Sequence, residues 1–337
     1  MRYEIACVPD LCQSGNERCG QRECVCGNAA LEERYRDTSY CDLDVRRSSY
    51  FPSGSNHAGD IKGLALSGCH IGATVSELND EAIAEIALCA CTGTRIFLDS
   101  GAFSEVDRDD IFKVVAPIAD AEWRRRLGVY LLLSIELGEQ LYIVAPDRVA
   151  DQDETLRRLK LYRRQVGLCR VAYANVIVPI QRGRMSMRDF AASAAEALGF
   201  DDFIPGIPSK KHATPLPELA AFLEAARPQR LHLLGLGPMS PRYPAVMQAA
   251  TKIVPRENVT CDSARIRQLV GWGVDGETPR ALTAANAALE ADGVERSTTE
   301  RKYRALQRVM LDQYDEQLRD ARLLGWRDPE LDEEKCA

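Results

Sequence analysis

The sequence of 337 residues contains no hydrophobic run long enough to cross a membrane. The longest apolar stretch, residues 129–144, includes Glu136 and Glu139, whereas a membrane-spanning helix needs about 20 predominantly apolar residues. The first residues, Met1-Arg2-Tyr3-Glu4, also lack the pattern of a secretory signal peptide. We therefore expect a cytoplasmic protein with no membrane partner.

An excess of positive charge is also missing. The formal net charge is −7, so the molecule as a whole does not attract nucleic acid. A nucleic-acid partner would have to bind local basic groups instead. Three such groups follow predicted strand ends, namely Arg182 with Arg184, Lys210 with Lys211, and Arg265 with Arg267.

Paired C-x-x-C motifs are absent, although the chain has 12 cysteines. In a cytoplasmic protein so many cysteines indicate metal binding or simple burial rather than disulfides. Cys24 and Cys26, preceded by Cys19, could supply thiolates to a tetrahedral zinc, with Cys12, Cys41 or His57 as the fourth ligand. We take Cys12, Cys19, Cys24 and Cys26 as the candidate ligands of a structural zinc, with burial as the alternative.

What the sequence does contain is a series of short hydrophobic runs bounded by Gly, Pro or polar residues, which is the pattern of buried strands. We predict strands at residues 3–8, 62–66, 95–98, 141–144, 175–180, 202–205, 230–236 and 258–261. Helical patterns separate most of them, at residues 76–89, 153–166, 186–198, 216–226 and 243–253, with two helices expected within 109–138.

Alternating strands and helices of this number favour a (β/α)8 TIM barrel of the α/β class. A doubly wound open sheet is the alternative, but no G-x-G-x-x-G follows the first predicted strand, and polar residues recur at the ends of most strands rather than at one switch point. We assign the barrel to residues 1–275, with a polar, cysteine-rich insertion at 9–60. Residues 276–337 are strongly charged and are expected to form a helical extension.

Two strand ends carry carboxylates, Asp99 and Asp262. In a parallel barrel the carboxyl ends of all strands face one mouth, so these residues are expected to converge. Two carboxylates at one mouth can divide the work of sugar transfer, one as nucleophile and one as general acid and base. The alternative is that each caps the helix that follows it.

Other strand-end residues are suited to holding a planar base. The amide of Gln181 could read the hydrogen-bonding edge of a base, and Gly206 would let backbone approach a ligand closely. Phe103 could stack on a base, although a phenylalanine there also suits a core. We interpret His232, inside the seventh predicted strand, as a satisfied core histidine.

These motifs together resemble a known family. The segments Asp99-Ser100-Gly101-Ala102-Phe103, Ala145-Pro146-Asp147, Pro179-Ile180-Gln181, Pro205-Gly206 and Cys261-Asp262-Ser263 are similar in order and spacing to the tRNA-guanine transglycosylase superfamily. The tRNA enzymes usually carry Asp-Ser-Gly-Gly-Phe. The form with alanine is more like the branch that inserts 7-deazaguanines into DNA, which is typical of bacteriophages and some bacterial genomic islands. The resemblance covers roughly residues 1–275.

The resemblance implies a role for each matching residue. Asp262 would attack the anomeric carbon and expel guanine, and Asp99 would handle the protons of the departing and incoming bases. Asp147, Gln181 and Gly206, with Ser100 and Phe103, would hold the base. The implied partners are DNA, single-stranded or as an opened duplex, a free 7-deazaguanine, and a helicase-like helper. The chemistry would need no cofactor.

One departure bears on the substrate. The tRNA enzymes bind zinc through Cys-x-Cys-x-x-Cys and a histidine in a C-terminal insertion, where this chain has only Cys336. That difference favours DNA over tRNA. The same chemistry on tRNA, a non-catalytic nucleic-acid-binding subunit and a two-carboxylate glycosidase remain as alternatives, the last disfavoured by the few aromatic residues expected at the mouth.

Overall fold

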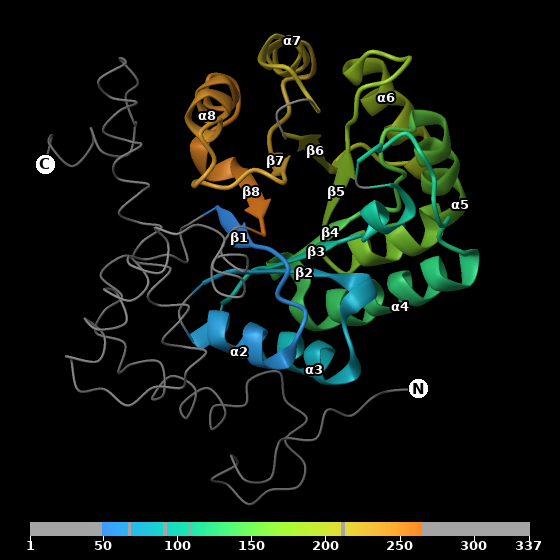
Figure 1. Ribbon diagram of the computed structural model, residues 1–337, viewed down its shortest axis with the longest axis vertical. Coiled ribbons are helices and arrows are strands. Elements are labelled where there is room, and N and C mark those ends of the chain that lie inside the picture. Colours follow the sequence, from blue (N-terminus) through green and yellow to red (C-terminus); the bar gives the residue numbers. More distant parts are fainter. Residues whose placement is uncertain (1–48, 67–68, 90–92, 108, 210–212, 265–337) are drawn as a thin grey trace, which may run out of the picture.

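The computed structural model describes residues 49–66, 69–89, 93–107, 109–209 and 213–264. Within them, eight parallel strands form one sheet in the order β1-β8-β7-β6-β5-β4-β3-β2. The helices α2 to α8 lie around the outside of this sheet (Figure 1). The molecule is therefore a (β/α)8 TIM barrel, as the alternation in the sequence predicts.

The elements have the following bounds. The strands are β1 (Tyr50–Pro52), β2 (Ile71–Thr74), β3 (Ile96–Asp99), β4 (Leu141–Val144), β5 (Asn175–Pro179), β6 (Ile204–Pro208), β7 (Leu231–Leu234) and β8 (Val259–Ser263). The helices are α2 (Ala58–Leu66), α3 (Asp80–Leu88), α4 (Asp120–Leu137), α5 (Gln152–Val171), α6 (Met187–Leu198), α7 (Leu216–Ala226) and α8 (Tyr243–Thr251). The short 3-10 helix η5 (Ala102–Glu105) follows β3.

Alternation along the strands divides the buried side chains into two clusters. Outward-facing residues, such as Ile96 and Leu98 of β3, pack against the helices in the larger cluster. Phe97, which lies between them, belongs to a smaller cluster inside the barrel with Phe51, Tyr142, Val144, Ile177 and Ile204. Because side chains of a strand alternate between faces, the next inward position after Phe97 is Asp99. The same alternation carries the catalytic candidates to the mouth.

The sheet closes where β1 meets β2. The backbone N–H of Ser55, just beyond β1, donates to the carbonyl of Gly72 in β2 at 3.1 Å. A Cβ at Gly72 would lie 2.5 Å from the Oγ of Ser53 and 2.8 Å from its Cα. The absence of a side chain at Gly72 is therefore what lets the two segments approach closely.

Of the two predicted N-terminal strands, the one at residues 62–66 needs correction. Residues 62–66 are helical, because Ile61, Leu64 and Ala65 are spaced to bury one face of α2. The stretch 9–60 was expected to be irregular, but its described part contains β1 and the start of α2. The predicted strand at 3–8 lies outside the described residues. Strands β3 to β8 are confirmed, with ends that differ from the prediction by at most three residues.

Two helices were expected within residues 109–138, and that prediction is wrong. The structure has one, α4, while residues 109–119 form turns and an antiparallel bridge joins Val106 to Val114. The remaining predicted helices are confirmed, and residues 276–337 lie outside the described part. None of the described helices combines the length and apolar character needed to cross a membrane.

We predict that Gly72→Ala destabilises the barrel, because the added methyl group overlaps the Cα of Ser53 as well as its hydroxyl, and the backbone atom cannot rotate away. The expected loss is about 1–3 kcal/mol in the free energy of unfolding, measured by urea titration. Gly167→Ala, in α5 with no atom within 4 Å of the new Cβ, is the control and should stabilise by about 0.5–1 kcal/mol. Equal effects of the two substitutions would contradict this account of the closure.

Candidate active site at the carboxyl ends of the strands

Asp262 lies in β8 and is held by donors from two other strand ends. Its Oδ2 accepts the hydroxyl of Ser53 at 2.9 Å, and its Oδ1 accepts the backbone N–H of Gly235 at 2.8 Å. The Nε2 of His232 lies 3.3 Å from the same Oδ1. Since each carboxylate oxygen has two lone pairs, Oδ1 is fully engaged while Oδ2 keeps one lone pair. Asp262 therefore presents an oriented oxygen.

His232 is fully buried in β7, next to Asp262. Its Nδ1 lies 2.8 Å from the Oγ1 of Thr260, and its ring stacks on Phe97 at a centroid distance of 4.7 Å. A carboxylate can only accept, so Nε2 carries the hydrogen toward Asp262. His232 is a satisfied barrel histidine, as its sequence context indicated, but its contact with Asp262 was missed. Alternation could have revealed that contact, because His232 pairs with Thr260, two residues before Asp262.

Asp99 ends β3 on the same rim. Its Oδ2 accepts the N–H of Gly101 at 3.2 Å, a local turn rather than a helix cap. The pKa of Asp99 is raised to about 6, chiefly by burial and then by the negative charge of Asp262, while backbone hydrogen bonds from Gly101 and Ser100 and the charge of Arg126 oppose the rise. The two predicted carboxylates thus interact electrostatically at one mouth.

Asp147 follows β4 and is buried beside Asp99. Its Oδ1 accepts the hydroxyl of Ser100 at 2.8 Å. The pKa of Asp147 is raised to about 7, chiefly by burial and also by the charge of Asp99, while the hydrogen bond from Ser100 and the charge of Arg158 oppose the rise. Near neutral pH the carboxyl of Asp147 can therefore either donate or accept a hydrogen bond.

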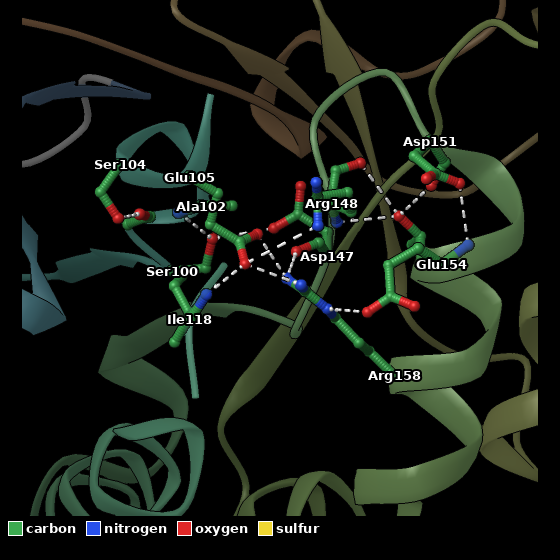
Figure 2. A network of polar contacts seen from close by, with 12 residues as sticks. Ser100, Ala102, Ser104, Glu105, Ile118, Asp147, Arg148, Asp151, Glu154 and Arg158 are labelled. Atoms are coloured by element: carbon green, nitrogen blue, oxygen red, sulfur yellow. Dashed lines mark hydrogen bonds and ion pairs between the residues drawn. The ribbon is translucent and has the colours of Figure 1, made fainter. Parts of the chain in front are cut away.

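A buried ion pair that sequence inspection did not single out fixes the loops carrying these residues (Figure 2). Glu105 of η5 accepts two bonds from Arg158 of α5, at 2.7 and 2.8 Å. The Nη1 of Arg158 also donates to the carbonyl of Asp147 at 2.6 Å. In parallel, Arg126 of α4 donates to the carbonyl of Ser100 at 2.7 Å. Helical arginines thus hold the backbone at both acidic loops.

Gln181, which was predicted to bind a base, is buried, and both hydrogens of its amide nitrogen already form hydrogen bonds within the protein. Its Nε2 donates to the carbonyl of Arg148 at 2.6 Å and to the Oγ1 of Thr155 at 2.9 Å. Its Oε1 accepts the N–H of Ala150 at 2.6 Å. In this conformation Gln181 fastens the loop after β4 and retains only one lone pair for a ligand.

Gly206 and Phe103 have contrasting surroundings. A Cβ at Gly206 would lie 2.7 Å from a methyl group of Ile177 and 3.1 Å from Leu234, so neighbouring side chains already occupy the space beside it. Phe103, in η5, is 55% exposed and presents an aromatic surface beside the loop of Asp99. Of the two, Phe103 is the one open to a ligand.

Of the basic residues predicted to bind nucleic acid, two lie in the described ranges, and both form exposed ion pairs. Arg182 pairs with Glu218 at 2.6 Å and Arg184 with Asp153 at 3.3 Å, both of a kind that contributes little to stability. Lys210, Lys211, Arg265, Arg267 and the candidate zinc ligands Cys12, Cys19, Cys24 and Cys26 lie outside the described residues. Within the described ranges, no three or more His, Cys, Asp or Glu side chains are grouped to hold a metal ion.

Comparisons with known proteins find similarity of fold. No protein-family model matches the chain, and no curated protein matches it. A putative fructose-1,6-biphosphate aldolase from Coccidioides immitis is 11% identical, with a TM-score of 0.42 over 82% of this chain and 92% of that one. A β-mannanase from Thermomonospora fusca is 13% identical, with a TM-score of 0.43 over 64% and 78%. The YdjI aldolase from Escherichia coli K12 is 10% identical, with a TM-score of 0.41 over 79% and 87%.

We predict that Asp147→Asn makes the protein more stable at pH 8 and leaves it similar to wild type at pH 4. The raised pKa means that the folded state holds this proton more tightly than the unfolded state. The resulting stability is full below pH 3.8 and is lost as the pH rises through about 7. The amide cannot ionise, so the variant should gain about 1–3 kcal/mol at pH 8 in denaturant titrations.

The control for this experiment is Asp201→Asn, at an exposed position before β6. It should change stability little at either pH. A difference between Asp147→Asn and wild type that is the same at pH 4 and pH 8 would contradict the burial of an ionising group.

Proposed function

We propose that the chain is a DNA-guanine transglycosylase, a pentosyltransferase that replaces guanine in DNA with a 7-deazaguanine base. One observation carries the proposal, namely that Asp99 and Asp262 share the barrel mouth in different states. Asp262 is oriented by three donors with a lone pair of Oδ2 left over, while Asp99 has a pKa raised to about 6. A carboxylate nucleophile and a carboxyl that exchanges protons near neutrality are what base exchange requires.

In the first half-reaction, the Oδ2 of Asp262 attacks the anomeric carbon of the target nucleotide. A bond forms between this oxygen and the carbon as the bond from the carbon to N9 of guanine breaks. Protonated Asp99 gives its proton to the departing guanine and becomes a carboxylate. The donors Gly235 and His232 remain on Oδ1, which is the carbonyl oxygen of the resulting ester.

In the second half-reaction, Asp99 accepts the N9 proton of the incoming 7-deazaguanine. That nitrogen attacks the anomeric carbon, and the ester bond to Asp262 breaks. Both carboxyl groups return to their starting states, and two successive inversions retain the configuration of the sugar. No oxidant, reductant or cofactor enters this sequence.

Base recognition is assigned to the acidic loop beside Asp99. Asp147, with a pKa raised to about 7, is suited to the amide and amine edge of a guanine-type base. Phe103 offers an exposed ring against which a flipped-out base could stack. Gln181 would contribute chiefly by holding the loop after β4. Two features of the sequence favour DNA over tRNA as the substrate. Residues 99–103 have alanine where the tRNA enzymes usually have a second glycine, and the C-terminal Cys-x-Cys-x-x-Cys of those enzymes is missing.

We predict that Asp262→Asn lowers exchange by at least about a thousandfold while DNA binding is retained, because only the attacking oxygen is lost. Exchange is measured by incorporation of labelled 7-cyano-7-deazaguanine into single-stranded DNA, duplex DNA and tRNA in parallel. Binding is measured by fluorescence anisotropy, and Asp201→Asn is the unchanged control. Normal exchange by Asp262→Asn would refute the nucleophile, and incorporation into tRNA alone would refute the DNA substrate.

A second prediction concerns the pH dependence of guanine release in a single turnover. Asp99 must be protonated for this step, so the rate should fall about tenfold per pH unit well above pH 6. Asp99→Asn should lose most of the rate and also this pH dependence. An unchanged pH profile in Asp99→Asn would assign the proton transfer to another group.

A further inference from the structure

A cavity of about 570 Å³ opens at the opposite end of the barrel, where the strands begin. Arg95 precedes β3, Tyr142 and Asn175 lie near the starts of β4 and β5, and Arg230 precedes β7. The C-terminal end of α5 adds Arg170 to the wall. The proposed base exchange uses none of these residues.

The cationic groups of this cavity are incompletely neutralised. Arg170 makes two bonds to Asp202, at 2.6 and 2.7 Å, and is thereby paired. Neither Arg95 nor Arg230 has a carboxylate within ion-pair distance in the described part of the chain. The lining as a whole holds three arginines and two carboxylates, the second being Glu139, in a chain of net charge −7. A local positive surplus of this kind favours an anion.

Arg230 is also fixed in place. Its Nη1 donates to the Oδ1 of Asn175. Asn175 is itself anchored, because its Nδ2 donates to the carbonyls of Glu139 at 2.7 Å and Leu141 at 3.2 Å. The guanidinium is therefore oriented before a ligand arrives, with further N–H donors left for a planar oxyanion.

A tyrosine hydroxyl adds a further donor. Tyr142 is only 8% exposed, and its ring packs on Phe51 at a centroid distance of 5.2 Å. Tyr142 lines the cavity, and its hydroxyl makes no hydrogen bond within the described ranges. A hydroxyl without a protein partner keeps its hydrogen for a ligand that enters the cavity.

We propose that this cavity binds a small organic oxyanion, a molecule that carries a phosphate or carboxylate group. Arg230, Arg95 and the hydroxyl of Tyr142 would donate to the oxyanion. Tyr173, which is 71% exposed, and Phe200 also line the cavity and would cover the organic part. The volume lies within the usual range for small-molecule sites, roughly 300–1,000 Å³. This site is separate from the proposed active site and does not depend on its chemistry.

The test is calorimetric titration of the full chain with inorganic phosphate and with malonate, which represent the two oxyanions. Sodium chloride at matched ionic strength serves as the reference for screening. We expect saturable binding of at least one probe. Arg230→Gln should weaken it about tenfold or more, and Tyr142→Phe about three- to tenfold, because each loses a donor to a charged group.

Two control variants separate this site from other sources of binding. Arg164→Gln, at an exposed position of α5 outside the cavity, should bind as wild type does and excludes a general charge effect. Asp262→Asn should also bind normally, whatever its exchange activity. The proposal is overturned if neither probe binds beyond the chloride reference. Wild-type affinity in both Arg230→Gln and Tyr142→Phe, each shown to be folded by thermal unfolding, would overturn it equally.

Discussion

The pairing of β1 with β8 is the interaction on which the rest of the structure depends. It joins the first and last described strands, with Tyr50 opposite Cys261 and Phe51 opposite Asp262. The same pairing places Ser53 within 2.9 Å of the carboxylate of Asp262. Pairing β1 with β8 and orienting the proposed nucleophile are thus one event. Because the partners are more than 200 residues apart, the loop-closure entropy is offset only by the whole cooperative sheet.

Four acidic side chains lie together at the mouth of the barrel, where their mutual repulsion opposes folding. Asp99, Asp147, Glu105 and Asp262 lie at one end of the barrel, and each is wholly or largely buried. Only Glu105 is neutralised by a two-bond ion pair, with Arg158. Asp99 and Asp147 instead have raised pKa values, which means that the folded structure disfavours their ionised forms. Such opposition is typical of functional sites, where a group is placed for its reactivity at a cost in stability.

The two ends of the barrel differ in chemistry. Carboxylates converge where the strands end, and arginines surround the cavity where the strands begin. Between them the aromatic rings of Tyr142, Phe51 and Phe97 fill the interior, and Phe97 stacks on His232 beneath Asp262. This packed interior separates the acidic end of the barrel from the arginine-lined end.

The sequence by itself determined the barrel from β3 to β8 and the location of Asp99, Asp147 and Asp262 at its mouth. Buried strands need unbroken hydrophobic runs, and parallel strands bring their carboxyl ends together whatever their separation along the chain. The three-residue strand β1 carries no such run, and residues 62–66 are apolar enough to suit either a strand or one face of α2. Local pattern cannot distinguish these cases.

Only the tertiary structure decided the partners of these side chains. Ser53 and Gly235 reach Asp262 through strand register, and Gln181 is directed to loop carbonyls that burial obliges it to satisfy. Arg158 of α5 likewise forms an ion pair with Glu105 of η5, which is 53 residues away in the sequence. Strand existence follows from local hydrophobicity, whereas hydrogen-bond partners follow from which chain segments the closed sheet brings within about 3 Å of one another.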